Sequence, residues 1–253
     1  MPHGIIPSEM NQIGQLNEQQ LHAALKAHYA GDGAQTEVLV DGYIIDVVRD
    51  GLLFEIQNGN FSSIKKKLKT LVANHQVRLV YPVAAEKWLL KLPKKGGGGC
   101  QTSPDVRIQR RCSDSTSPKR RKSPKRGRLV DVFAELVSFP DLIMQPNFSL
   151  EVALIWEEEV RRYTGRKRWR RNGWETVDRR LLKVLEGRVF ETPEQMGALL
   201  PHNLPEAFTT TDIAEGLEIP LWLAQKMAYC LREMGVITMI GKQSRSVLYT
   251  INR

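Results

Sequence analysis

The sequence contains no uninterrupted apolar run of 18 residues, so we expect no transmembrane helix. Its first residues, MPHGIIPSEM, lack the pattern of a secretory signal, and three cysteines are a sparse, odd number. Both features indicate a cytoplasmic protein in a reducing compartment. A P-loop, a dinucleotide-binding fingerprint, an HExxH motif and paired CxxC motifs are absent from the sequence, so we expect no organic cofactor.

Positive charge is abundant and unevenly placed. The formal net charge is +9, which favours an acidic partner, with nucleic acid first and an anionic membrane surface second. Residues 91–128 hold thirteen Lys or Arg against two acidic residues, so the remainder of the chain is close to neutral. The basic character therefore belongs to particular segments and not to the whole surface.

The first 92 residues predict a regular alternation of helices and strands. We expect helices over 16–30 and 62–73, and strands over 35–40, 43–49, 52–57, 77–83 and 86–92. Asp41-Gly42 and Asp50-Gly51 predict two-residue hairpin turns between the first three strands. The second helix is long enough for a right-handed crossover, so we expect the third and fourth strands to be parallel.

The rest of the chain predicts three further regions. Residues 93–127 form a basic, low-complexity insert that we expect to be disordered, and residues 128–175 form a connecting region with a basic hairpin. In the connecting region, 128–139 predicts a helix, and the apolar start of 148–164 favours a strand. In the last region, 176–253, we expect helices over 175–190, 193–200, 209–219 and 220–235, then strands over 236–241 and 246–252. Helix, turn, helix and hairpin at the end are typical of a winged helix-turn-helix.

Three carboxylates are expected to meet in the first region. Two-residue turns set a register in which Asp46 lies opposite Glu55, and Glu37 lies opposite Asp46. Like charges directly opposite each other destabilise a sheet, and a hard cation such as Mg²⁺ between them removes the repulsion. The alternative is a solvated or salt-bridged face, but the neighbours Ile44 and Val48 on the same face are apolar. The pattern therefore favours a metal site.

The first region has an α-β-β-β-α-β order in which Asp46 is followed nine residues later by Glu55-Ile56-Gln57. This pattern resembles the PD-(D/E)XK (restriction-endonuclease-like) nucleases. The resemblance covers residues 16 to about 92. It implies an α/β fold with a mixed sheet, here followed by a winged helix domain, and an endonuclease that cuts DNA with Mg²⁺ or Mn²⁺. Asp46 and Glu55 would bind the metal, with Glu37 as a further ligand.

The resemblance also identifies where this chain departs from the family. The lysine that orients or helps to deprotonate the attacking water corresponds to Gln57, which cannot take a proton. A lysine at 65–67, or Lys69, is a candidate substitute, and a solvated helix face is the alternative for these lysines. Many members carry a glutamate on the first helix, and Glu18 matches it.

Further DNA contacts are expected from the second helix of the winged helix, from its wing and from the basic turn before Trp174. Basic side chains there would neutralise phosphates, and aromatic ones would stack on bases. The alternative is a winged helix used for protein contacts. The expected DNA-binding residues are Gln225, Lys226, Tyr229, Arg232, Lys242, Arg245, Arg168, Arg170 and Arg171.

Two other functions stay open on the sequence alone. A non-enzymatic DNA-binding regulator with a degenerate nuclease fold is favoured by Gln57. A structural or interaction protein that binds RNA is the third. Nucleases of this kind often work as dimers, so a homodimer is one expected state.

Overall fold

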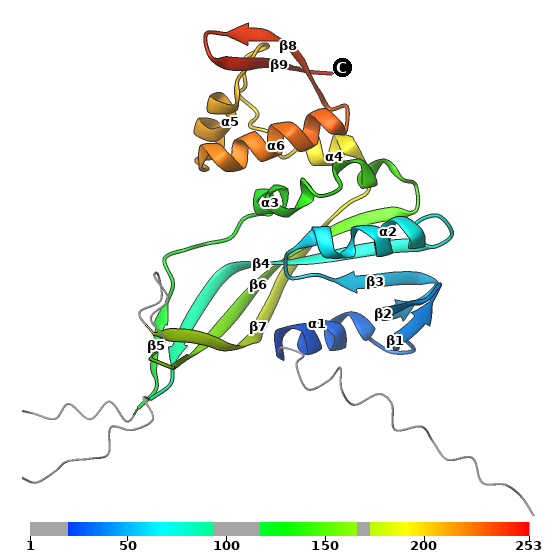
Figure 1. The fold of residues 1–253 in the computed structure, drawn as a ribbon, viewed down its shortest axis with the longest axis vertical. Coiled ribbons are helices and arrows are strands. Elements are labelled where there is room, and N and C mark those ends of the chain that lie inside the picture. The colour runs from blue at the N-terminus through cyan, green and yellow to red at the C-terminus, as the bar shows by residue number, and fades with distance from the viewer. Residues whose placement is uncertain (1–19, 94–116, 166–172, 253) are drawn as a thin grey trace, which may run out of the picture.

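The structure, a computed structural model, describes residues 20–93, 117–165 and 173–252. It is a mixed α/β fold in which helices cover both faces of a mixed seven-stranded sheet (Figure 1). The strands are β1 (Gln35–Val40), β2 (Tyr43–Arg49), β3 (Leu52–Ile56), β4 (Gln76–Lys91), β5 (Lys119–Lys122), β6 (Phe148–Tyr163) and β7 (Trp174–Phe190), with β8 (Ile237–Gln243) and β9 (Ser246–Ile251) in a separate hairpin. The α-helices are α1 (Gln20–Ala30), α2 (Lys65–Leu71), α3 (Phe133–Leu136), α4 (Pro193–Gly197), α5 (Thr210–Leu217) and α6 (Leu221–Glu233), and the 3₁₀ turns are η2 (Phe61–Ile64), η3 (Leu129–Val132) and η4 (Pro140–Met144).

Two tight hairpins build the first three strands in the predicted register. All four residues of Asp41-Gly42 and Asp50-Gly51 have positive φ, as a type I′ turn requires. β1, β2 and β3 are consequently antiparallel neighbours. The turn chemistry of four residues thus decides which side chains of three strands can meet.

The helix α2 makes the crossover that the sequence predicts. β3 pairs with β4 in parallel, and β4 pairs with β6 in parallel, before β7 returns antiparallel to β6. The sheet order is β1-β2-β3-β4-β6-β7, with β5 beside the far half of β4. The predicted parallel pairing of the third and fourth strands is confirmed.

The predicted helix over 175–190 is wrong, because this segment is β7. Its Leu, Arg, Lys and Glu are good helix formers, but the segment lies antiparallel to β6 along its length. Pairing with a long neighbour overrides the local preference. Residues 176–190 therefore belong to the sheet, and the helical region that we expected from 176 begins only at α4.

Two other segments also differ from the expectation. The predicted strands over 77–83 and 86–92 are one continuous strand, β4, with an irregularity between Ala84 and Glu86. Within the insert that we expected to be disordered, Lys119–Lys122 form β5 at the edge of the sheet. A fully basic edge strand discourages further strand pairing, which explains how so polar a segment is tolerated there. Residues 94–116 of the insert lie outside the described part of the chain.

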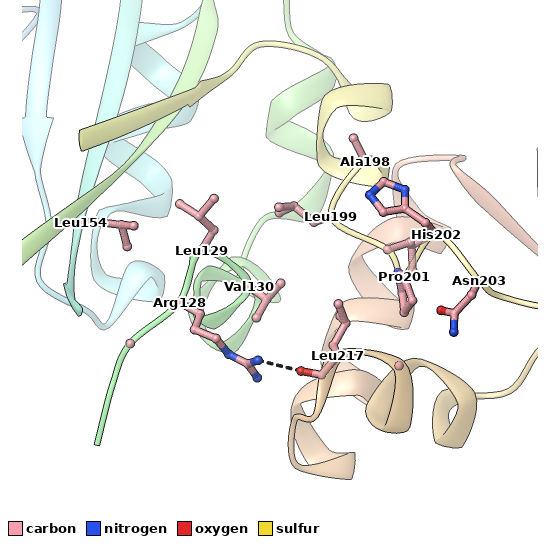
Figure 2. Close-up of a pocket in the computed structure, with 13 residues that line it drawn as sticks. Arg128, Leu129, Val130, Leu154, Ala198, Leu199, Pro201, His202, Asn203 and Leu217 are labelled. Carbon is pink, nitrogen blue, oxygen red and sulfur yellow. Dashed lines mark hydrogen bonds between the residues drawn. The ribbon is translucent and has the colours of Figure 1, made fainter. Parts of the chain in front are cut away.

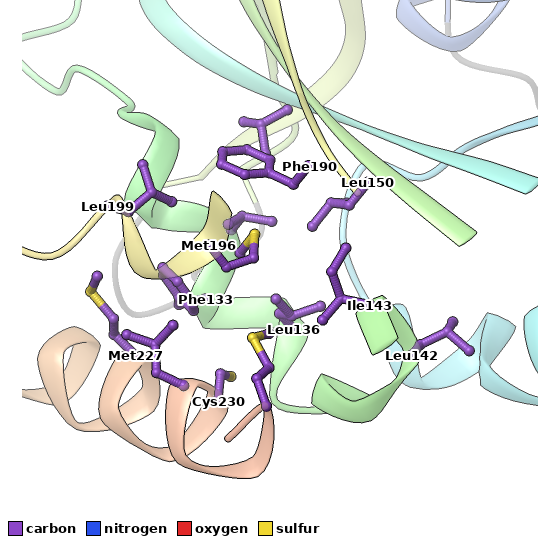
Figure 3. Close-up of a cluster of buried hydrophobic side chains, with 14 of the residues drawn as sticks. Phe133, Leu136, Leu142, Ile143, Leu150, Phe190, Met196, Leu199, Met227 and Cys230 are labelled. Atoms are coloured by element: carbon purple, nitrogen blue, oxygen red, sulfur yellow. The ribbon is translucent and has the colours of Figure 1, made fainter. Parts of the chain in front are cut away.

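Two clusters of buried apolar side chains hold the layers together. The smaller joins α1 to one face of the sheet through Leu21 and Leu25. The larger lies on the other face and runs continuously from α2 through α3 to the C-terminal helices (Figure 3). In this cluster Phe133 of α3 lies between the sheet and α6. None of the helices in the described residues is long and apolar enough to cross a membrane.

Because the sheet and the C-terminal helices share one core, we expect them to unfold together. Phe133→Ala should lower the free energy of unfolding by about 3–5 kcal/mol, since it removes a fully buried aromatic ring. Urea unfolding followed by circular dichroism and by tryptophan fluorescence should give coincident transitions. Met144→Ala, at a side chain that is 49% exposed, is the matched control and should change the stability by less than about 0.5 kcal/mol. Two separated transitions would show that the C-terminal helices are an independent unit.

Candidate functional site

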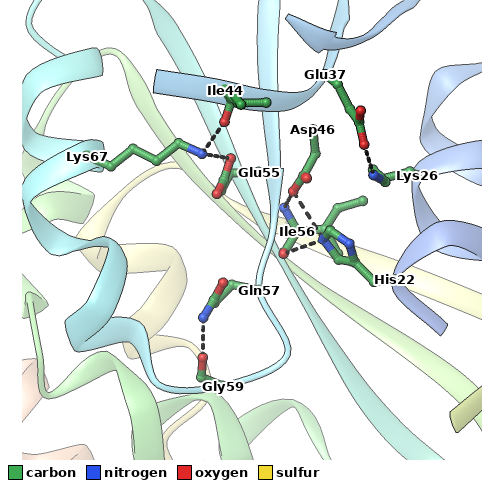
Figure 4. Close-up of polar contacts among 10 residues, drawn as sticks. All are labelled: His22, Lys26, Glu37, Ile44, Asp46, Glu55, Ile56, Gln57, Gly59 and Lys67. Atoms are coloured by element: carbon green, nitrogen blue, oxygen red, sulfur yellow. Dashed lines mark hydrogen bonds and ion pairs between the residues drawn. The ribbon is translucent and has the colours of Figure 1, made fainter. Parts of the chain in front are cut away.

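Asp46 lies where the strands β2 and β3 part. Their regular pairing ends at Val47 and Phe54, and beyond it the backbone N–H of Ile56 donates to Asp46 Oδ2 at 2.8 Å. His22 of α1 lies against the same carboxylate, with its Nε2 3.3 Å from Asp46 Oδ2 and 3.1 Å from the carbonyl oxygen of Ile56 (Figure 4). Both of these neighbours accept hydrogen bonds, so Nε2 carries the hydrogen in this arrangement. The Asp46 side chain thus replaces the next ladder bond and joins the sheet to α1.

Glu55 is the second carboxylate of the cluster, and it is held from the opposite side of the sheet. It is buried, with 7% of its surface exposed. Lys67 of α2 donates from Nζ to Glu55 Oε2 at 2.6 Å and to the carbonyl oxygen of Ile44 at 2.6 Å. The two residues that follow Lys67 on the inner face of α2, Leu68 and Leu71, are fully buried. The helix is therefore anchored so that this lysine reaches the sheet.

The two carboxylates have opposite pKa shifts. Burial raises the pKa of Glu55, the nearby charge of Asp46 raises it further, and Lys67 only partly offsets these effects. Burial also acts to raise the pKa of Asp46, but His22, the Ile56 N–H and Lys67 together bring that pKa below its ordinary value. Neighbouring carboxyl groups whose pKa values are pushed apart are typical of functional sites.

Glu37 and Gln57 are placed differently from Asp46 and Glu55. Glu37 has a positive φ of 54° within β1, and its carboxylate accepts from Lys26 Nζ at 2.9 Å. Figure 4 shows it directed toward α1, away from Glu55. The side-chain amide of Gln57 donates to the carbonyl oxygen of Gly59 in the following loop. The structure thus brings together Asp46 and Glu55 but not the full row of three carboxylates.

The atoms around Asp46 are a carboxylate, an imidazole nitrogen and a carbonyl oxygen, which are kinds of atom that bind divalent cations. The separations of His22 Nε2 from Asp46 Oδ2 (3.3 Å) and from Ile56 O (3.1 Å) are those of hydrogen bonds. Among the described residues, however, no group of three or more His, Cys, Asp or Glu side chains could hold a metal ion. Any cation here would therefore rely on the Ile56 carbonyl and on water.

The predicted DNA contacts of the C-terminal region lie on α6 and on the β8–β9 hairpin. Most are exposed, and Arg232 lies over the ring of Tyr229 at 5.6 Å. Lys226 instead donates to the carbonyl oxygen of Ala134 at 2.7 Å, so it is part of the contact between α6 and α3. The exposed residues of the predicted set are Gln225, Tyr229, Arg232, Lys242 and Arg245.

Four predicted site residues cannot be placed. Glu18, Arg168, Arg170 and Arg171 lie outside the described residues.

A separate pocket of about 610 Å³ lies between η3, β6 and the segment around α5, remote from the carboxylates (Figure 2). Its lining is mainly apolar, with Leu129, Leu154 and Leu199 among the side chains. At its rim Arg128 donates to the carbonyl oxygens of Leu217 (2.7 Å) and Glu218 (3.0 Å). Arg128 therefore caps the end of α5, which is a structural role.

The sequence offered Lys67 only as one of several candidate lysines on its helix, and it assigned His22 no role in the cluster. Each lies beside a fully buried leucine, His22 after Leu21 and Lys67 before Leu68. A polar residue beside the apolar stripe of a helix can reach the sheet that the stripe covers. Its place beside Leu68 would therefore have favoured Lys67 over the two lysines that precede it.

Comparison with known proteins relates the chain to a family. Residues 19–105 and 104–191 match the family described as "Domain of unknown function (DUF8091)". The chain is also 30% identical over 239 residues to a protein of Treponema pallidum (strain Nichols) described as "Uncharacterized protein", covering 94% of this chain and 86% of that one. No solved structure matches the chain significantly.

The opposed pKa shifts yield a prediction about the carboxylates. Because the charge of Asp46 raises the pKa of Glu55, Asp46→Asn should lower that pKa, and Lys67→Met should raise it by removing the favourable cation. The measurement is an NMR pH titration of the Glu55 side-chain carboxyl carbon without metal. Glu37→Gln is the matched control and should leave the titration unchanged, since Glu37 pairs with Lys26 and not with Glu55. An unchanged Glu55 titration in Asp46→Asn would contradict the coupling.

The same shifts set the sign of the pH dependence of stability. A raised pKa in the folded state means that the contribution of Glu55 is present below its unfolded pKa and is lost as the pH rises through the folded value. Asp46 acts in the opposite sense, and its contribution is lost as the pH falls through its lowered pKa.

Proposed function

Because the chain belongs to the family described as "Domain of unknown function (DUF8091)", we propose its function from the geometry of the Asp46–Glu55 cluster. The protein is a metal-dependent endonuclease that hydrolyses phosphodiester bonds in DNA. The winged-helix-like C-terminal region holds the duplex.

The contact between Lys67 and Glu55 carries this proposal. In the PD-(D/E)XK pattern that this chain resembles, a lysine lies two residues after the glutamate, and this chain has Gln57 there. Lys67 reaches the same glutamate from α2 at 2.6 Å. An ammonium group beside the second carboxylate is therefore present, although it comes from a different element. With Lys67, the cluster has one group of each kind that the resemblance calls for.

Each side chain has a defined task in this reaction. A bound Mg²⁺ or Mn²⁺ would lower the pKa of a water molecule and neutralise charge on the phosphate. Asp46 and the Ile56 carbonyl would hold the cation, with Glu55 completing the anionic side. Lys67 would position the attacking water and stabilise the negative charge that develops on the phosphate oxygens. His22 keeps Asp46 oriented while Nε2 carries the hydrogen, and in the tautomer with the hydrogen on Nδ1 the Nε2 lone pair would be available to the cation.

The surrounding fold supports DNA as the substrate. The elements α1, β1, β2, β3, α2 and β4 follow the α-β-β-β-α-β order of the nuclease core, and β3 and β4 are parallel. The elements α5, α6, β8 and β9 follow the order of a winged helix-turn-helix. On α6 the exposed side chains Gln225, Tyr229 and Arg232 offer the amide, aromatic and guanidinium groups that contact bases and phosphates.

A second function, a DNA-binding regulator that does not cut, is favoured by one specific observation. The amide of Gln57 is committed to Gly59, so the residue at the family's lysine position takes no part in the cluster. If Lys67 only neutralises Glu55, the cluster is a structural salt bridge.

The test is cleavage of labelled duplex, flap and junction DNAs with Mg²⁺, Mn²⁺ or EDTA. We expect metal-dependent products from the wild type, and a loss of roughly 10²–10³-fold in rate for Glu55→Ala and Lys67→Met, which remove electrostatic stabilisation of the reacting phosphate. DNA binding in EDTA should persist in both variants.

Lys66→Met is the matched control, because Lys66 is an exposed residue on the same helix. It should retain the wild-type rate. If Glu55→Ala cleaves as fast as the wild type, the site is wrong. If no variant cleaves while binding remains, the regulator replaces the nuclease.

A further inference from the structure

The far halves of β4, β6 and β7, with β5 beside them, form an arm that extends past α1 and α2 (Figure 1). We define the arm by the described residues 86–93, 117–126, 156–165 and 173–183. β4 and β6 are each 16 residues long, whereas β3 has five, so most of this length has no partner in the first three strands. The nuclease proposal leaves the arm without a role.

In the inner part of the arm, acidic side chains of β6 are paired with basic side chains. Three consecutive buried glutamates of β6 each meet a basic residue. Lys87 lies 2.5 Å from Glu157, Arg120 lies 2.7 Å from Glu158, and Arg161 lies 2.9 Å from Glu159. Each of these three buried glutamates is therefore paired with a cation.

The pairing of acidic with basic side chains ends at the last row that β4, β5 and β6 share. Lys91 of β4 is paired directly with Lys119 of β5 on one side and with Arg161 of β6 on the other. Three adjacent strands therefore present three basic residues in one row, which we call the tip row. Arg161 shares Glu159 with Lys87, and Lys91 lies over the ring of Trp174 at 4.7 Å. Lys119 is exposed and forms no ion pair with a described residue.

Like charges directly opposite each other destabilise a sheet. Because neighbouring paired strands are only about 4.8 Å apart, the backbones of the two lysines and the arginine cannot move away from one another. A partner that brings several negative charges removes this cost. The adjoining strand β5 continues the positive surface with the exposed Arg121.

We propose that the tip row binds the phosphate backbone of duplex DNA. The row offers closely spaced cations and no set of base-reading amides, so its contacts fix position and not sequence. The binding itself does not depend on the nuclease reaction. Only the use of the bound DNA rests on the proposed function.

The strand β4 connects this contact to the carboxylate cluster and sets the distance between them. Glu55 pairs with Leu79, and Lys91 lies farther along the same strand. At about 3.3 Å per residue, the strand between Leu79 and Lys91 spans at most about 40 Å. Duplex DNA rises about 3.4 Å per base pair, so on a duplex that runs along β4 the tip row would contact the backbone at most about 12 base pairs from the bond at Glu55. The nuclease would therefore need a flank of about one helical turn on one side of its cut.

The first experiment measures duplex binding in EDTA as a function of salt, so that cleavage plays no part. In Lys91→Gln/Lys119→Gln, the slope of log affinity against log salt should become shallower by about 1.8, since each lost phosphate contact contributes about 0.9. The change should be the same for unrelated sequences. Because the variant loses like-charge repulsion, its melting temperature should be equal or higher, which separates lost binding from lost folding.

Arg188→Gln is the matched control, because Arg188 is an exposed cation on β7 outside the arm. It should retain the wild-type slope. An unchanged slope in the double variant overturns the proposal. Loss of binding to an acidic polypeptide such as polyglutamate, with DNA binding intact, also overturns it and assigns the row to a protein partner.

The second experiment shortens the duplex on one side of the cleavage position, base pair by base pair. The wild-type rate should fall when the flank drops below about 10 base pairs, and the double variant should be insensitive to this length. If the protein cuts no DNA but the salt slope still changes as expected, the nuclease proposal fails and the tip row remains a DNA contact.

Discussion

Two neighbouring carboxylates, the buried Glu55 and the partly buried Asp46, are the constraint on which the central part of this structure depends. An uncompensated charge inside a protein costs several kcal/mol, and Asp46 and Glu55 also repel each other. The protein compensates each from a different layer: His22 comes from α1 on one face of the sheet, and Lys67 comes from α2 on the other. Both helices must therefore dock in fixed positions.

This requirement explains why α2 is anchored by fully buried leucines despite being so rich in lysine. If Leu68 and Leu71 did not hold the helix on the sheet, Lys67 would lose the Ile44 carbonyl and Glu55 together. The same docking makes α2 the crossover between β3 and β4. Charge compensation and the parallel pairing of these strands are thus two results of one helix position.

Local sequence features were sufficient to predict the first three strands of the fold, but they were insufficient to predict the strands of the arm. The Asp-Gly turns need only two residues each to determine a hairpin, so the register of β1, β2 and β3 followed from the sequence. β7 has the composition of a helix and becomes a strand only because β6 lies beside it. β5 is a strand for the same reason, since four consecutive basic residues have no local cause to be extended. Such non-local pairing leaves no signal within the segment itself.

The site shows the same division at the level of single residues. The proximity of Asp46 and Glu55 followed from the turns, whereas Lys67 and His22 come from helices whose docking depends on the whole core. Glu37 departed from the predicted row because a positive φ turns its carboxylate to Lys26, which removes one of three like charges from the cluster. In a regular strand β1, Glu37 would have repelled the other two carboxylates, and the irregular backbone at Glu37 avoids this repulsion.

The arm handles charge in a different way, and the contrast supports separate roles for the two ends of the sheet. At Glu159, burial acts against the charged form, yet Arg161 and Thr176 bring the pKa down to about 2, so this carboxylate stays ionised and neutralises its neighbours. Two rows farther out, Lys91 and Lys119 are paired directly, and their row contains no acidic residue. A chain that supplies three glutamates in succession to balance the inner rows has the means to balance the last row as well. A row of three basic residues without an acidic one, beyond rows that contain the paired glutamates of β6, is what a surface for an external polyanion requires.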